Sequence, residues 1–256
     1  RLIKLPVAPV KLLLLSFFTW SDDHENMYEG IFADYVFCNA DEDMSDDERF
    51  AAFQKFIMAW NKHANSFENN VSLSVVTPIY TDAEMRGGSD FFFVKHAPSR
   101  KALGAFNQKV TELISGDDKM PEPPFECEDA NETFQRVGPS SGGEEYSEGI
   151  VEYWPCNYTE GADPMAMREA EAKLALEHYA NGAEGGFRYI YPGSGSPREG
   201  SPDFYISRGS PSFEARGASH DIYWAETQGS EADLERRKHM SCANSSLWSW
   251  WRLKES

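Results

Sequence analysis

The sequence predicts an α+β protein made of two tandem copies of one βαββαβ unit. Three observations lead to this prediction. Short motifs recur in the same order, strand-like and helical segments alternate in the same way in both copies, and each copy carries two cysteines at corresponding places. The copies span residues 29–137 and 148–256, with a Gly- and Ser-rich linker at 138–147.

The recurring motifs keep their order along the two copies. Glu-Gly-Ile at 29–31 recurs at 148–150, and Cys-Asn at 38–39 recurs at 156–157. Asp-Phe at 90–91 recurs at 203–204, and Pro-Ser at 98–99 recurs at 211–212. Because the offset between the copies drifts by only a few residues, an internal duplication is the simplest interpretation.

The elements of the first copy follow from local patterns. Ser45 and Glu48 form a capping box that starts a helix, and apolar residues then recur at helical spacing: Phe50, Phe53, Ile57, Trp60 and Ala64. A second helix is expected to start near Ser99. Strands are expected at 31–37, 73–80, 91–95 and 133–137.

The second copy repeats this order. Helices are predicted at about 164–179, from near Ser212, and at about 231–239, and strands at 150–154, 187–191, 204–208 and 247–253. In the last strand Trp248 and Trp250 share one face, which is expected to fill the core between the two sheets. The alternative is that these two tryptophans form the wall of a ligand site.

Each copy therefore has the ferredoxin-like plan, in which two helices cover one face of a four-stranded sheet. The open face of such a sheet needs cover. We expect the two copies to pack sheet to sheet and form a pseudo-dimer within one chain.

The four cysteines are expected to form two disulfides. The first and last strands of a ferredoxin-like sheet are antiparallel neighbours, which favours Cys38–Cys127 and Cys156–Cys242. Buried free thiols and a reactive or metal-bound cysteine are the alternatives, although no CxxC motif occurs. Disulfides persist in oxidising compartments, so this pairing favours an exported protein.

The N-terminal segment at 1–28 supports the same interpretation. Basic residues at 1, 4 and 11 precede an apolar run at 12–18, a pattern typical of an export signal, and the run is too short for a membrane span. The alternative is a buried strand. A secreted or periplasmic location is therefore predicted.

The net charge narrows the range of partners. It is −18 at pH 7, and so negative a surface repels phosphate backbones and anionic lipids. Neither nucleic acid nor a membrane surface is an expected partner.

The candidate site residues are few. His96 follows a strand directly, and its counterpart is Gly209, so its role would belong to one copy only. Drift on a surface loop is the favoured explanation of this asymmetry. Lys95 and Arg208 occupy corresponding places and could hold an anion or pair with surface carboxylates. His63 follows Trp60 on the first helix. No histidine spacing matches a metal motif, so no metal or cofactor is predicted.

Two such units packed sheet to sheet resemble the dimeric α/β-barrel superfamily, which includes monooxygenases of the antibiotic-biosynthesis type. The resemblance covers nearly the whole chain after residue 28 and rests on element order and duplication. It implies a cleft between sheet and helices that binds a small apolar or aromatic molecule. It also implies a monomeric pseudo-dimer or a homo-oligomer.

Two functions remain open. The first is an exported, non-catalytic small-molecule-binding or interaction protein, with five candidate ligand contacts: His96, Lys95, Arg208, His63 and Trp60. The second is a monooxygenase-like oxidoreductase, cofactor-independent or haem-using, with His96 or His63 as the working polar group. An enzyme should gather at least two converging polar groups in one closed pocket.

Overall fold

The computed structural model describes residues 29–254, apart from 65–66, 68–69, 82–87, 117–119, 143–145 and 198. The segment expected to resemble an export signal, 1–28, lies outside these residues. The elements of the first half are β1 (Glu29–Ala40), α1 (Asp46–Ala64), β2 (Ser72–Tyr80), β3 (Phe91–Ala97), α2 (Arg100–Ser115) and β4 (Phe125–Ser140).

The second half contains the same order of elements with one extra helix and one extra short strand. Its elements are β5 (Glu148–Tyr158), α3 (Pro164–Ala180), β6 (Gly186–Pro192), β7 (Phe204–Ser210), α4 (Phe213–Ile222), a π-helical turn (Tyr223–Thr227), α5 (Glu231–His239), β8 (Met240–Cys242) and β9 (Ser246–Lys254).

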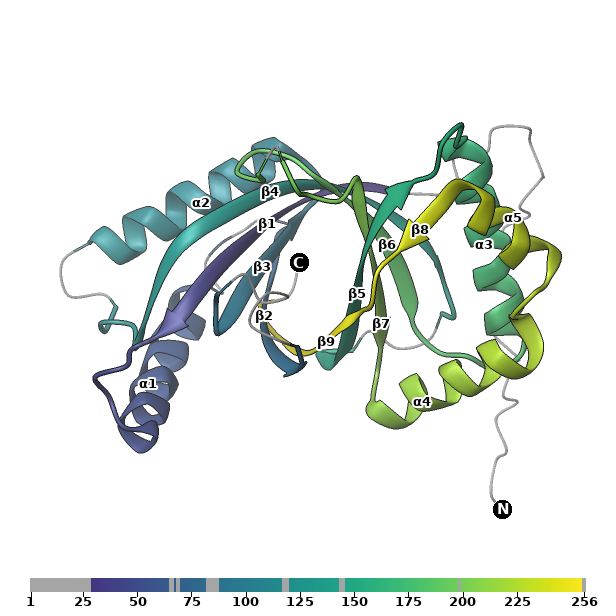
Figure 1. Ribbon diagram of the computed structural model, residues 1–256. Helices are drawn as coiled ribbons and strands as arrows, with labels where there is room; N and C mark the ends of the chain where they lie inside the picture. Colours follow the sequence, from purple (N-terminus) through teal and green to yellow (C-terminus); the bar gives the residue numbers. More distant parts are fainter. Residues whose placement is uncertain are drawn as a thin grey trace, which may run out of the picture.

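The strands form one antiparallel sheet that closes on itself (Figure 1). The first half has the order β4-β1-β3-β2, and the second half has β9-β5-β7-β6. Pairing of β4 with β6 and of β2 with β9 joins the halves into a barrel-like sheet of eight strands. The strands of both halves therefore belong to one closed, barrel-like sheet. Closure satisfies the edge N–H and C=O groups that an open sheet leaves exposed.

An apolar cluster lies inside the barrel. Residues of both halves meet there, including Phe92 and Val76 from the first half and Val151 and Trp248 from the second. Trp248 is 4% exposed, and Trp250 packs against the same cluster. The expected role of these tryptophans in the core between the sheets matches their positions.

The helices lie outside the barrel, with α1 and α2 over the first half and α3, α4 and α5 over the second (Figure 1). The capping box of α1 is present, because Ser45 and Glu48 hydrogen-bond each other through side chain and backbone. The expected apolar face of α1 is wrong at Phe50, which is 64% exposed, and Phe56 is buried instead. The buried face of α1 is centred on Phe56 and Trp60, one helical turn apart, and Phe50 lies outside this face.

Both halves carry a disulfide at the same place. Cys38 bonds Cys127, and Cys156 bonds Cys242, which are the two pairs favoured by the sequence analysis. Each pair links the end of the first strand of its half to a neighbouring antiparallel strand. These disulfides indicate an oxidising compartment.

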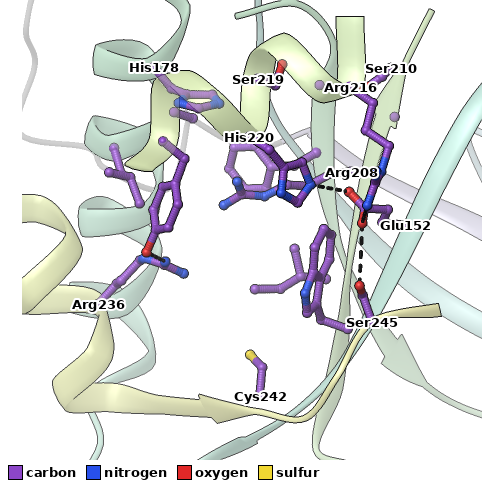
Figure 2. A pocket seen from close by; sticks show the side chains of 18 of the residues that line it. Glu152, His178, Arg208, Ser210, Arg216, Ser219, His220, Arg236, Cys242 and Ser245 are labelled. Atoms are coloured by element: carbon purple, nitrogen blue, oxygen red, sulfur yellow. Dashed lines mark hydrogen bonds and ion pairs between the residues drawn. The ribbon is translucent and has the colours of Figure 1, made fainter. Parts of the chain in front are cut away.

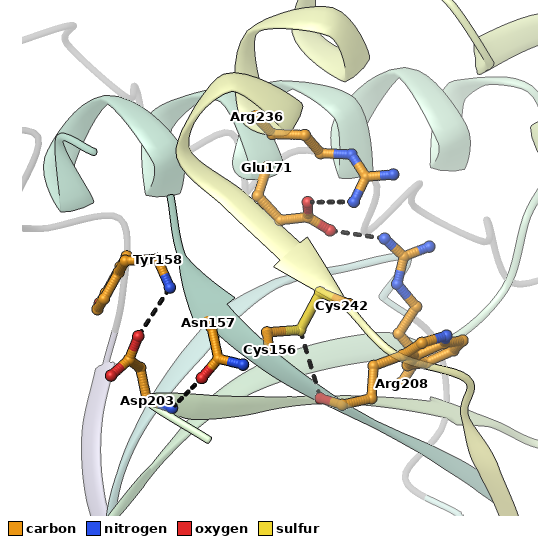
Figure 3. Close-up of a disulfide and its surroundings, with 9 residues drawn as sticks. Cys156, Asn157, Tyr158, Glu171, Asp203, Arg208, Arg236 and Cys242 are labelled. Carbon is orange, nitrogen blue, oxygen red and sulfur yellow. Dashed lines mark hydrogen bonds and ion pairs between the residues drawn. A yellow bond between two sulfur atoms is a disulfide. The ribbon is translucent and has the colours of Figure 1, made fainter. Parts of the chain in front are cut away.

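A second shared contact lies beside each disulfide. The carboxylate of Asp90 accepts a hydrogen bond from the backbone N–H of Ala40, and that of Asp203 accepts one from Tyr158. In return, Asn39 and Asn157 accept bonds from the N–H groups of Asp90 and Asp203. Figure 3 shows the contacts of Asp203 in the second half. The matching aspartates thus fix the end of the first strand in each half.

Among the described residues, no helix is long and apolar enough to cross a membrane.

Candidate functional site

A cleft of about 740 Å³ opens in the second half, between the outer face of the sheet and the helices α3, α4 and α5. Figure 2 shows His178, Ser219 and His220 on the helical side and Glu152 and Arg208 on the strand side. The cleft is amphipathic. Its described lining includes aromatic side chains together with four arginines, two histidines and two glutamates.

The apolar part of the cleft includes five aromatic residues, Trp154, Tyr179, Phe187, Tyr223 and Trp224. The Arg208 guanidinium carbon lies 5.7 Å from the Trp154 ring centroid, a cation–π arrangement. Trp224 is 63% exposed at the rim. A flat apolar group would therefore find aromatic surface to stack on.

Two buried carboxylates, those of Glu171 and Asp233, form ion pairs with three of the arginines. Glu171 has no exposed surface and binds Arg208 (Nη2–Oε1, 2.6 Å) and Arg236 (Nη1–Oε2, 3.2 Å), as Figure 3 shows. Asp233, equally buried, binds Arg236 and Arg237. Neither carboxylate lines the cleft, so the guanidinium groups lie between these carboxylates and the cleft.

These ion pairs determine the charge of the buried acids. Burial alone would raise the pKa of Glu171, but the charges of Arg236 and Arg208 outweigh it and lower the pKa below its ordinary value. Glu171 is therefore ionised at neutral pH. Removal of its charge would leave two guanidinium groups without their shared partner.

A second cluster lies across the cleft and centres on Glu152. This carboxylate is 4% exposed and accepts hydrogen bonds from Arg216 (2.6 Å) and His220 (3.0 Å). Burial raises the pKa of Glu152, while the bonds from His220 and Arg216 lower it by more, so the net shift is downward. Glu152 thereby fixes a histidine and an arginine of α4 against the strand.

Two polar atoms of α4 have no partner within the described residues. They are Nε of Arg216 and Oγ of Ser219, both buried and both on residues that line the cleft. Buried donors normally find a partner. A ligand or water in the cleft would provide one.

His178, on α3, completes the polar lining. Burial, assisted by the positive charges of Arg208 and His220, lowers the pKa of His178 to about 4. Its imidazole is therefore neutral at pH 7. Thr227 Oγ1 lies 3.5 Å from its Nδ1.

The same positions in the first half are apolar and filled. Helices α1 and α3 begin at Asp46 and Pro164, an offset of 118 residues, and α2 and α4 begin at Arg100 and Phe213, an offset of 113. At these offsets His178, Arg216 and Ser219 correspond to Trp60, Leu103 and Phe106, which pack together in one core cluster. The exposed fractions of these three first-half side chains are 4%, 2% and 0%. Three core positions of the first half thus carry polar residues in the second half, where the cleft lies.

The structure distributes the predicted site residues over three places. Arg208 lines the cleft of the second half, whereas His96 lines a different cavity inside the barrel. Lys95 pairs with the largely buried Asp34 (3.3 Å) and donates to Asn107 (2.7 Å). Neither Trp60 nor His63 is among the described residues that line these two cavities.

Sequence reasoning missed most of the cleft, including His178, Glu152, Arg216, Ser219 and Arg236. A residue-by-residue comparison of the two copies would have revealed three of them, since an apolar residue of one helix is polar in the other. Within the described residues no group of three or more His, Cys, Asp or Glu side chains could hold a metal ion.

Comparison with known proteins supports the fold. No family model and no curated protein sequence matches the chain. A solved mutant chlorite dismutase from Candidatus Nitrospira defluvii has a TM-score of 0.52 at 9% identity, covering 87% of this chain and 92% of that one. The same enzyme in complex with imidazole has a TM-score of 0.52 at 10% identity, covering 91% and 96%. These proteins belong to the dimeric α/β-barrel superfamily, so the similarity agrees with the fold expected from the sequence. At such low identity it shows the fold alone.

Proposed function

We propose that this protein binds a small molecule with a negative charge and a flat apolar body in the cleft of the second half. The observation that carries the proposal is the exchange of Trp60, Leu103 and Phe106 in the filled first half for His178, Arg216 and Ser219 around the cleft. Arginine donors suit carboxylates and other oxyanions, and the aromatic wall suits a planar ring.

The layout of charge supports an anionic ligand. The chain carries a net charge of −18, yet four arginines converge on one cleft. Buried carboxylates bind all four of these side chains, so little conformational entropy is lost when a ligand binds. Arg216 still has an unpartnered Nε that can donate to an anion.

A planar aromatic carboxylate tests this proposal. Titration calorimetry with 2-naphthoate should show saturable binding with one site per chain, and the neutral 2-naphthamide should bind at least about tenfold more weakly. Arg216→Gln should raise the dissociation constant for 2-naphthoate about tenfold or more. Arg100→Gln is the matched control, because Arg100 is an exposed arginine of the first half paired with Glu132. Equal affinity for acid and amide would overturn the proposal.

Haem is a second candidate ligand, since it combines a flat ring with two carboxylates. His178 favours it: this imidazole is 8% exposed and lines a cleft large enough for a porphyrin. His178 would then hold the iron, and the arginines would hold the propionates. The bound iron would supply redox chemistry, which corresponds to the oxidoreductase alternative.

Absorption spectroscopy tests the haem candidate independently of activity. Added hemin should give a saturable shift of the Soret band with wild-type protein and with His63→Ala, whose histidine lines neither cavity. The shift should be lost or altered in His178→Ala. An identical Soret band in His178→Ala would show that His178 does not hold the iron.

We further infer that the halves are two copies of one unit, spanning 29–137 and 148–256 with 138–147 between them, and that the protein is exported. Matching disulfides and the matching Asp90 and Asp203 contacts support the duplication. The two disulfides also support export.

A further inference from the structure

A second cavity lies inside the barrel, separate from the cleft but sharing part of its wall. Its volume is about 410 Å³, and strands of both halves line it. Four residues, Gly186, Phe187, Gly209 and Ser210, line both spaces. The two cavities are therefore back to back across one part of the sheet.

The polar lining of the barrel cavity is basic and hydroxylic. Arg188 of β6 and Arg252 of β9 line it together with His96 of β3 and six serines. Guanidinium and hydroxyl groups donate hydrogen bonds, which is the chemistry that carboxylates and other oxyanions need in a binding site.

A hydrogen-bond chain positions Arg188. Its Nη1 donates to Nε2 of His96 (2.6 Å) and lies 3.5 Å from Oε1 of Gln135. Gln135 is fully buried and donates to the hydroxyl of Tyr35 (3.0 Å). These residues come from β3, β4 and β1 of the first half, whereas Arg188 belongs to the second, so the chain fixes the guanidinium across the junction of the halves.

His96 acts as an acceptor in this chain. Burial, together with the positive charges of Arg188 and Arg252, holds the pKa of His96 well below its ordinary value. The neutral ring can therefore accept a hydrogen bond from Arg188 without adding a third positive charge. Both guanidinium groups act on His96, which indicates that their fields overlap in the cavity.

We propose that the barrel cavity is an anion site, in which Arg188 and Arg252 bind a small carboxylate or oxyanion and His96 positions Arg188. Aromatic side chains of Tyr35, Tyr153 and Trp250 also line the cavity, and the serine hydroxyls can donate to further oxygens of the anion. The site goes beyond the cleft ligand proposed above. It also gives His96, which has Gly209 at the corresponding place in the other half, a role in one half only.

Anion titrations at constant ionic strength test this site. Inorganic phosphate and acetate should each raise the midpoint of thermal unfolding relative to chloride, and the one with the larger shift identifies the preferred class. For that anion, calorimetry should give a dissociation constant at least about tenfold higher in Arg188→Gln and in Arg252→Gln. Arg100→Gln should match the wild type. Unchanged binding in both variants, or no saturable binding to wild type, would overturn the proposal.

Binding of 2-naphthoate separates this test from that of the cleft. Arg188→Gln and Arg252→Gln should keep the wild-type affinity for 2-naphthoate, which also shows that the variants are folded. Arg216→Gln should keep the wild-type affinity for the small anion. If Arg188→Gln fails to fold, Arg252→Gln alone decides, because a dissociation constant equal to that of the wild type contradicts the site. Parallel loss of both ligands in every variant would indicate one shared site and contradict the separate anion site.

Discussion

The two halves solve the same packing problem with different results. In the first half the space between sheet and helices is filled by Trp60, Leu103, Phe106 and their neighbours. In the second half corresponding positions carry His178, Arg216 and Ser219, and a cleft of about 740 Å³ remains. The same arrangement of strands and helices thus encloses an apolar core in one half and leaves a cleft in the other.

The buried ion pairs differ in the same direction. At matching strand positions Lys95 lies beside Asp34, and Arg208 lies beside Glu152. Lys95 pairs with Asp34, its direct neighbour. Arg208 instead reaches Glu171 on α3, while Glu152 is bound by Arg216 and His220. In the second half, ion pairs therefore join strands to helices, whereas in the first half the ion pair lies between two strands and the neutral Asn107 of α2 hydrogen-bonds both of its members.

We expect the largest effect on the free energy of unfolding from a substitution that creates a cavity in the core of the first half. Phe106→Ala removes a ring with no exposed surface and should lower the free energy of unfolding by about 3–5 kcal/mol. Its counterpart Ser219→Ala removes one hydroxyl beside a cleft and should cost less than about 1 kcal/mol. Urea unfolding followed by circular dichroism measures both. Similar costs for the two variants would break the comparison.

We expect the second largest effect on the free energy of unfolding from removal of the Glu171 carboxylate. Glu171→Ala leaves Arg208 and Arg236 without their shared partner and should cost about 3 kcal/mol, the low end for a buried pair because the cleft admits solvent to Arg208. Asp34→Ala should cost about 1 kcal/mol, because Lys95 can lose its proton when its partner is removed, whereas an arginine cannot. Urea unfolding of both variants at pH 7 measures the difference. A larger cost for Asp34→Ala would contradict it.

A larger side chain in the cleft of the second half should weaken ligand binding and leave folding intact. Ser219→Phe restores the side chain of the first half at that position and should occupy part of the cleft. We expect the dissociation constant for 2-naphthoate to rise about tenfold or more, while the free energy of unfolding changes by less than about 1.5 kcal/mol. Calorimetry and urea unfolding provide the two measurements. Unchanged affinity would place the ligand elsewhere.

The smallest expected effect is the contribution of His96, at the junction of the halves, to the pH dependence of stability. Burial and the charges of Arg188 and Arg252 lower the pKa of His96, so the folded protein keeps this ring neutral where the unfolded chain protonates it. Stability should therefore fall as pH drops below about 6.5, by about 1 kcal/mol between pH 7.5 and 5.5 for this one group.

Replacement of His96 by a side chain without a charge change tests this pH effect. His96→Gln should lose less stability than the wild type over that pH range in urea titrations. His63→Gln serves as the control, because His63 lines neither cavity. Equal pH slopes for wild type and His96→Gln would show that His96 does not contribute.

The frame of the fold could be predicted because its determinants are local. The Ser45–Glu48 capping box, the alternating strands and the cysteine spacing each act over a few residues or one strand pair. Closure of the barrel could not, because pairing of β4 with β6 and of β2 with β9 depends on the relative placement of whole sheets.

The residues of the cleft could not be predicted from the sequence for a different reason. His178, Arg216 and Ser219 are ordinary residues for helices, and only their facing positions make a site. Arg208 was found because its counterpart, Lys95, is also basic. His96 was found by its asymmetry with Gly209, but the barrel cavity that it lines includes Arg188 from the other half, which local sequence patterns do not connect to it.

A crystal structure of the protein with 2-naphthoate tests the central claim most directly. We predict density for the ring against Trp154 in the second-half cleft, with the carboxylate within hydrogen-bond distance of Arg216, and no ligand between the sheet and helices of the first half. Density only in the barrel cavity or in the first half, or an empty cleft at a saturating concentration, would contradict the account.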